Sequence, residues 1–364
     1  FRLSYGSTAS PYGGDFDYLA TYAVGASYGG VMGIQASRAG NVDFDWEYIN
    51  EFNAGMDIAL FQERWLRLSV DYYNKITNNM YILQPPPATS GFSSLNLSTG
   101  KMQNKGIERD INADILRSGN FKWSLGMNAA YNKNTILEVT DYTDEFADGD
   151  SRIIKVGYSY GTYFAPKWAG VDTETGEPQY YDKEGNITKT YNATEQSVPL
   201  DASLYPKWTG GLHTQISYKG FTASALLSFV ADVMRWNNED FYNENQRYAT
   251  SNQSKRMLYN RWQNPGDSGD KAILQRLDIP RVFTSKDIQD ASFLRLRNVR
   301  VGYTFDADAL KSLKVIKGIS LFVQGQNLFT WTKWRGLDPE NNQVYGRFQY
   351  PNSNTFTGGL NVNF

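Results

Sequence analysis

Long segments of the chain alternate strictly between apolar and polar residues. The clearest runs from Phe121 to Asn132, and the C-terminal segment Thr355–Phe364 repeats it. Because successive side chains of an extended strand point to opposite faces, each such strand has one apolar and one polar face. The same period of two is found in Trp46–Leu60, Trp208–Tyr218 and Phe221–Phe229. The pattern predicts β-strands with one face suited to lipid and the other to water.

The links between these strands alternate between short and long. Short links are expected at Gln62–Glu63, Ser118–Asn120 and Lys219–Gly220, and the long polar stretches are Leu83–Met102, Thr135–Pro206, Met234–Asp290 and Thr332–Asn352. Short periplasmic turns and long extracellular loops are typical of outer-membrane barrels. We therefore predict an all-β fold, a transmembrane antiparallel β-barrel, to which this chain contributes about ten strands with long extracellular loops.

Three local irregularities stand out from this regular pattern. The apolar residues of Phe293–Phe305 change phase near Asn298, which predicts a β-bulge. Glu239–Trp262 has few β-branched residues and mixed charge, which favours a helix within a loop. The acidic, glycine-containing segments 172–177 and 182–186 predict the turns of a small hairpin.

Composition narrows the functional classes. The chain has 25 Tyr, 20 Phe and 9 Trp, a composition that suits the aromatic girdles of a membrane barrel. Its formal net charge of -2 gives no cationic surplus for phosphates, so we expect no nucleic-acid partner. With no Cys and one His, the sequence excludes disulfides and metal sites built on thiolates or several imidazoles. We expect no cofactor and no metal.

A hydrolase is the main alternative to a barrel without catalytic function, because a serine or histidine hydrolase can be built on a small barrel. His213 lies on the predicted inward face. No recognisable motif sets a Ser or a carboxylate beside it, so we expect a polar lumen residue and no catalytic site. The acidic stretch 141–150 lacks the spacing of a calcium-binding loop and reads as a solvated loop.

The predicted extracellular loops are rich in aromatic and amide side chains. Flat rings with amide donors and acceptors can hold a sugar face or a peptide backbone, although rings can also simply pack long loops together. We take these residues as candidates for ligand binding: Trp236, Tyr242, Asn245, Asn342 and Tyr345. The aromatic C-terminal residue Phe364 resembles the insertion signal read by the outer-membrane assembly machinery.

Several motifs resemble the SusC/RagA family of TonB-dependent outer-membrane transporters and occur in that family's order along almost the whole chain. They are Arg2–Thr8, Asp45–Glu47, Val70–Thr77, Asn104–Glu108, Tyr205–Leu212, Ala291–Val299, Gly325–Thr330 and Gly336–Glu340. The resemblance implies a barrel of about 22 strands, of which residues 1–364 are the C-terminal part. We expect the family's plug domain and TonB box to lie outside this chain.

The resemblance also implies a function. Members of the family import nutrient oligomers, glycans or oligopeptides, across the outer membrane of Bacteroides-type Gram-negative bacteria. Expected partners are a SusD-like surface lipoprotein acting as a lid, TonB through the N-terminal part, an oligosaccharide or oligopeptide ligand, and the lipid bilayer with its lipopolysaccharide. The alternatives are a siderophore or vitamin receptor of the same architecture and a barrel that only displays surface loops. The residues leave the choice between glycan and peptide open.

Overall fold

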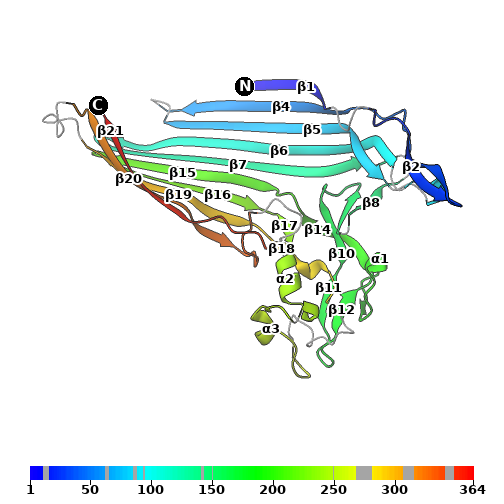
Figure 1. Cartoon of the computed structure of the whole chain (residues 1–364). Coiled ribbons are helices and arrows are strands. Elements are labelled where there is room, and N and C mark those ends of the chain that lie inside the picture. Colours follow the sequence, from blue (N-terminus) through cyan, green and yellow to red (C-terminus); the bar gives the residue numbers. More distant parts are fainter. Residues whose placement is uncertain are drawn as a thin grey trace. The chain divides into compact units, whose positions relative to one another are not determined.

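A computed structural model describes residues 1–10, 16–61, 65–84, 88–92, 95–140, 143–149, 151–248, 250–267, 281–305, 315–340 and 348–364. The described residues are mostly β-strand, in agreement with the all-β prediction (Figure 1). Across these ranges, no helix reaches the length and apolarity that a bilayer crossing requires.

The largest element is a sheet of ten strands, the number that the sequence predicts. In spatial order its strands are β1 (Arg2–Ser10), β4 (Glu47–Leu60), β5 (Leu66–Gln84), β6 (Leu95–Ser118), β7 (Phe121–Glu138), β15 (Trp208–Tyr218), β16 (Phe221–Ala231), β19 (Phe293–Thr304), β20 (Gly318–Thr332) and β21 (Thr355–Asn363). Spatial order follows chain order, as expected of an up-and-down arrangement.

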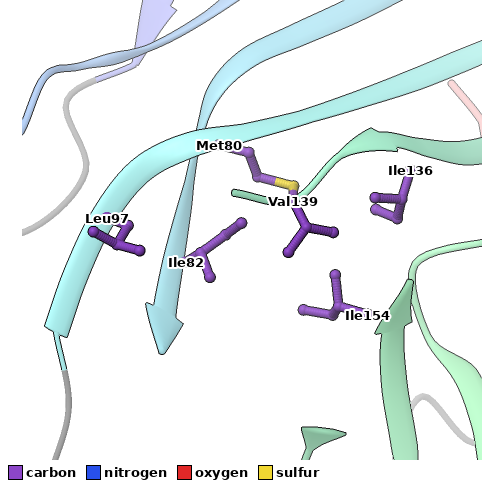
Figure 2. Close-up of a cluster of buried hydrophobic side chains, with 6 residues drawn as sticks. All are labelled: Met80, Ile82, Leu97, Ile136, Val139 and Ile154. Carbon is purple, nitrogen blue, oxygen red and sulfur yellow. The ribbon is translucent and has the colours of Figure 1, made fainter. Parts of the chain in front are cut away.

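The chain divides into two compact units, and strands β4 to β7 contribute residues to both. The first unit contains Phe1–Met56, Asp71–Ile107 and Asn132–Gly161, and the second contains Asp57–Val70, Glu108–Tyr131 and Thr162–Phe364. In the first unit, a cluster of buried side chains joins the far ends of β5, β6 and β7 to a short strand, β9 (Arg152–Lys155) (Figure 2). Its members are Met80, Ile82, Leu97, Ile136, Val139 and Ile154.

In the second unit, the register of the strands places apolar side chains in one row across six of them. The apolar row is Trp123, Ile216, Ala223, Val301, Val323 and Gly358. The neighbouring positions form a polar row of Ser124, Gln215, Ser224, Arg300, Gln324 and Thr357. The sheet therefore has one apolar and one polar face, as the alternation predicts.

The apolar face is not covered by a protein core. Trp123, Val323, Leu360 and Phe364 are 37 to 72% exposed. On the polar side, the first unit shows amide side chains bonded to one another, with Asn104 accepting from Asn132 at 3.2 Å and from Asn134 at 2.9 Å. Exposed apolar side chains on one face and hydrogen-bonded amides on the other are the arrangement of a wall between lipid and water.

The turn between β15 and β16 explains why glycine stands at position 220. Tyr218 pairs with Phe221, so Lys219 and Gly220 form a two-residue hairpin turn. Both have positive φ, at 45° and 85°, as such turns require. A Cβ on Gly220 would lie 2.5 Å from the Thr304 carbonyl oxygen, so only glycine fits.

The expected β-bulge lies in β19. The pairing with both neighbouring strands shifts between Leu296 and Asn298. Against β16, Arg297 is the extra residue, whereas against β20 two residues, Asn327 and Leu328, lie opposite Arg297. This shift turns Arg295 and Arg297 to the polar face on one side of the bulge and Arg300 to the same face on the other, in accordance with the phase change in the sequence.

The long loops contain further elements. They are β2 (Thr21–Tyr28), β3 (Val31–Arg38), β8 (Glu145–Asp148), β9, β10 (Thr162–Pro166), β11 (Trp168–Val171), β12 (Pro178–Tyr181), β13 (Ile187–Thr188), β14 (Ser197–Ser203), β17 (Met234–Trp236), β18 (Ile288–Asp290), α1 (Ala193–Gln196), α2 (Asn238–Asn243) and α3 (Arg256–Tyr259). Strands β11 to β13 are the predicted small hairpin extended by one strand. Helix α3 lies within the stretch Glu239–Trp262 expected to be helical, and α2 begins one residue before it.

The structure corrects the predicted bounds of two loops. Segment Leu95–Met102 was expected in a loop but belongs to β6, and Thr135–Glu138 belongs to β7. These strand ends are long because their apolar residues pack with Ile154 from the loop that follows. The β2–β3 hairpin was not anticipated. The expected short link at Gln62–Glu63 lies outside the described residues.

Candidate ligand-binding loops

The candidate site is built around α2, which follows β17 directly in the second unit (Figure 1). Asn237 caps the helix, because its side-chain oxygen accepts from Asp240 N–H at 2.9 Å. The other end of the same amide donates to Gln289 Oε1 at 2.9 Å. Asn237 is fully buried, so this residue fixes α2 against β18.

Two acidic residues of this segment hold cations from distant parts of the chain. Buried Asp240 accepts a hydrogen bond from Arg256 and forms an ion pair with Arg335 at 3.0 Å. Glu244 accepts from Arg256 Nε at 2.8 Å. Paired and hydrogen-bonded charges of this kind avoid the large free-energy penalty of an isolated buried ion. The result is a connection between α2, α3 and the loop after β20.

Glu239 clamps that same loop through its backbone. Its two carboxylate oxygens accept from Leu337 N–H at 3.1 Å and from Phe348 N–H at 3.0 Å. Burial raises the pKa of Glu239, and the two amide donors act in the opposite direction. One carboxylate on α2 therefore binds the backbone of both Leu337 and Phe348.

A second clamp comes from the strand wall. Arg295, which is 2% exposed, donates to Asp338 and, at 2.8 Å, to Glu340. Arg297 donates to Glu340 as well and to Ser228 Oγ at 2.6 Å. Burial alone would raise the pKa of Asp338, but hydrogen bonds from Asn352 N–H and from Arg295 outweigh it and hold that pKa below its usual value. The motif Gly336–Glu340 is thus bonded to the bulge in β19.

Aromatic rings form a chain along the clamped segments. The ring centroid of Trp236 is 4.0 Å from Phe283 and 6.4 Å from Phe241. Tyr242 continues the chain, 4.9 Å from Tyr248 and 6.4 Å from Phe348. Tyr242 and Tyr248 are each 37% exposed and Phe348 is 50% exposed. We define these three side chains as the exposed ring cluster; they can offer flat faces to a ligand.

The predicted ligand-binding residues differ in burial, and two of them lie outside the described residues. Trp236 is partly buried among rings, and Tyr242 belongs to the exposed ring cluster. Asn245 is 2% exposed, and its side-chain oxygen accepts from Arg247 N–H at 3.1 Å. Asn342 and Tyr345 lie outside the described residues. Phe364 follows the end of β21 and is exposed.

His213 sits on the polar face of β15. Its ring occupies the space above Gly126 of the adjacent strand, where a Cβ would lie 1.9 Å from His213 Cε1. Among the residues that the structure describes, no three acidic or histidine side chains converge as metal ligands.

The residues that sequence reasoning missed are the clamps: Glu239, Arg295, Arg297, Asp338 and Glu340. A signal for two of them was present, because Arg295 and Arg297 alternate with leucines on a strand and so share its polar face. Two arginines on a partly buried face need carboxylates. Their partners lie more than forty positions away in sequence, so the pattern alone could not name them.

Comparison with known proteins places this geometry in a family. The family model described as TonB dependent receptor-like, beta-barrel matches residues 1–328. The TonB-dependent receptor SusC of Bacteroides thetaiotaomicron is 28% identical over 391 residues, which span 100% of this chain and 37% of that receptor. A TonB-dependent receptor of Formosa agariphila is 28% identical over 418 residues, which span 100% of this chain and 40% of the receptor.

Solved structures of transporters in the same family are similar to this chain as well. A chain of the RagAB peptide transporter is 29% identical with a TM-score of 0.88, and a chain of the RagAB peptide importer in the open-open state is 29% identical with a TM-score of 0.89. Each match covers 100% of this chain and 40% of the other. The resemblance to SusC/RagA and the predicted fold class are confirmed. The chain spans about two fifths of the length of the curated relatives it matches.

Proposed function

Because this chain belongs to the TonB dependent receptor-like, beta-barrel family, we propose that it is the C-terminal part of a SusC-like importer in the outer membrane of a Bacteroides-type bacterium. The complete protein imports nutrient oligomers, glycans or oligopeptides. Its plug domain and TonB box lie outside residues 1–364, and energy from the inner membrane reaches it through TonB. This segment supplies barrel wall and part of the mouth.

The observation that carries this proposal is the pair of rows across six strands, one apolar and one polar. A soluble sandwich buries its apolar rows against a second sheet, whereas here Val301 and Val323 are more than half exposed. Lipid is the medium that suits such a face, and a water-filled path suits the polar one.

The loops support a role in ligand capture. We propose that the exposed ring cluster, together with Asn342 and Tyr345, contributes to binding, with rings stacking on the oligomer and the Asn342 amide bonding to it. Trp236 and the buried Asn245 contribute by holding these loops in place. A SusD-like lipoprotein closes over the loops as a lid. The two clamps, of Glu239 on Leu337 and Phe348 and of Arg295 on Asp338 and Glu340, support this assignment, because a binding surface on long loops has to be pre-organised.

We propose no catalytic role for the chain. His213 packs on Gly126 in the sheet, away from any recognised nucleophile motif. Replacing His213 by Ala should leave uptake and any hydrolysis of the cargo unchanged. Loss of a hydrolytic activity in that variant would support the alternative that the barrel is a hydrolase.

Deletion of the TonB box in the full-length protein is the test of the importer. Uptake of a labelled oligomer should stop while its binding to the cell surface persists, because capture precedes the energy-dependent step. Unchanged uptake would exclude the proposal.

Growth of a disruption mutant on defined glycans, peptides and iron chelates then separates the cargo classes. Loss of growth only on iron chelates would favour a siderophore receptor, and normal growth on all of them a surface-display barrel.

A further inference from the structure

The apolar face contains a groove of about 540 Å³ across the last strands of the sheet. Strands β16, β19, β20 and β21 line it with Phe221, Val301, Tyr303, Leu321, Val323 and Leu360. All of these residues belong to the second unit. The lining is almost entirely apolar, so the groove suits a hydrocarbon and not a polar ligand.

Strand register explains why a groove forms here. Phe221, Tyr303, Leu321 and Leu360 pair in one row and form a wall of large side chains. The next row on the same face is Ala223, Val301, Val323 and Gly358, which begins and ends with small residues. Among the described residues, a Cβ on Gly358 would meet only the Phe322 carbonyl oxygen, at 3.9 Å, so no side chain of β20 fills the space above it.

The groove ends at a belt of rings beside a cation. The Phe221 and Tyr303 ring centroids are 4.4 Å apart, and Phe305 follows at 5.0 Å from Tyr303. Lys219, in the turn next to Phe221, extends over the Tyr218 ring with its Nζ 5.5 Å from the centroid. Tyr218 pairs with Phe221 and so lies on the same face. Rings and a lysine at this level are what a membrane interface contains.

We propose that this groove is a specific binding site for a phospholipid, with an acyl chain beside Gly358 and the phosphate at Lys219. The bilayer supplies the occupant, because the groove opens on the face that meets lipid. The cation lies at a short hairpin turn, and short turns face the periplasm in outer-membrane barrels. The leaflet on that side consists of phospholipid, which selects a phospholipid over lipopolysaccharide.

The test uses the full-length protein extracted from outer membranes in detergent and washed free of loosely held lipid. Mass spectrometry of the intact protein measures the retained phospholipid. In Gly358→Leu the added side chain fills the groove, and its Cβ touches the backbone only at an ordinary van der Waals distance, 3.9 Å from the Phe322 carbonyl oxygen. Lys219→Gln removes the cation from the exposed turn and leaves Gly220, which the turn requires, in place. Ala129→Leu adds the same kind of bulk to the apolar face of β7, outside the groove, and is the control.

We expect about one phospholipid to remain on the wild type and on Ala129→Leu, since a single groove holds a single chain. Most of it should be lost from Gly358→Leu, and Lys219→Gln should retain less than the wild type. Retention by Gly358→Leu equal to that of the control, or bound lipopolysaccharide in place of phospholipid, would overturn the site. If Gly358→Leu does not assemble, equal retention by Lys219→Gln and wild type decides against it. The site depends on the barrel fold and not on the cargo, so an importer without uptake activity could still contain it.

Discussion

Single charged residues, and not only an apolar core, order the loops of the second unit. Asp240, Glu239 and Asp338 are largely buried, and each accepts at least two hydrogen bonds from groups distant in sequence. Buried carboxylates satisfied in this way specify one arrangement, because any other would leave a charge unpaired. Rigid placement of the rings next to them follows from these bonds.

Replacing Glu239 by Gln should loosen the loop after β20 at Leu337 and Phe348 without unfolding the barrel. The amide keeps one acceptor oxygen, so either Leu337 N–H or Phe348 N–H loses its partner. An unsatisfied buried donor costs about 1 to 3 kcal/mol. Hydrogen exchange at the Leu337 and Phe348 amides should become faster, and protease should cut the loop after β20 more readily. Glu184→Gln, the same change on an exposed turn, is the control; equal exchange in both variants would contradict the clamp.

Because the pKa of Glu239 is raised, the contribution of Glu239 to stability changes with pH in a defined direction. A carboxyl with a pKa raised above the ordinary 4.5 binds its proton more tightly in the folded loop than in the unfolded one. Its contribution to stability is therefore larger below 4.5 and declines as pH rises through the raised value. Glu239→Gln should abolish this part of the pH dependence of protease resistance, and an unaltered profile would contradict it.

At the scale of elements, the sequence predicts strands well and their ends less well. Alternation located β7, β15 and β21 because a membrane wall imposes a period of two along each strand. The start of β6 was missed, since Asn96, Ser98 and Gly100 resemble a loop. Packing of Leu97 with Ile82 and Ile154 makes it a strand, and such contacts cannot be read from one segment alone.

The turn between β15 and β16 should not tolerate a side chain at position 220. Gly220→Ala forces a Cβ into positive φ and against the Thr304 carbonyl, so it should destabilise the hairpin by about 1 kcal/mol or more. The urea midpoint of the full-length protein, followed by the gel mobility of folded and unfolded forms, measures this. Gly6→Ala, at a position with open space and ordinary φ, is the control and should match the wild type.

The β11–β12 turn contains an ion pair with a measurable titration. A hydrogen bond from Lys189, with others from Thr175 N–H and Glu174 N–H, lowers the pKa of Asp172 to about 2. Its contribution to the turn is complete above the ordinary value of 3.8 and is lost as pH falls towards 2. Lys189→Gln should raise the Asp172 pKa, as seen by NMR of carboxyl-labelled protein. Lys183→Gln should not, and a Lys189→Gln variant with an unchanged pKa would exclude the pairing.

At the scale of the whole molecule, the sequence predicts a wall with one apolar and one polar face, as the structure has it. It does not predict how neighbouring strands are aligned. Periodicity predicts which residues of one strand share a face. It does not give the register that joins Trp123 to Val301 and Gly358 across the sheet, because register depends on turns and on the bulge at Arg297. The same limit applies to the site: ring-rich loops were recognisable, whereas the clamps that order them were not.

Neighbouring positions of β20 give the sharpest test of the wall. Val323 belongs to the apolar row and Gln324 to the polar row, so one strand offers both faces at the same depth. Val323→Arg should destabilise the barrel by about 1 to 3 kcal/mol, because Val323 lies one row in from the interfacial rings and the cost of an arginine facing lipid rises from the interface towards the midplane. Gln324→Arg should cost less, about 1 kcal/mol at most, since water receives its charge even though Arg300 lies opposite. Urea unfolding in phospholipid vesicles measures both. Equal losses would mean that the two faces meet the same medium, and the wall between lipid and water would have to be abandoned.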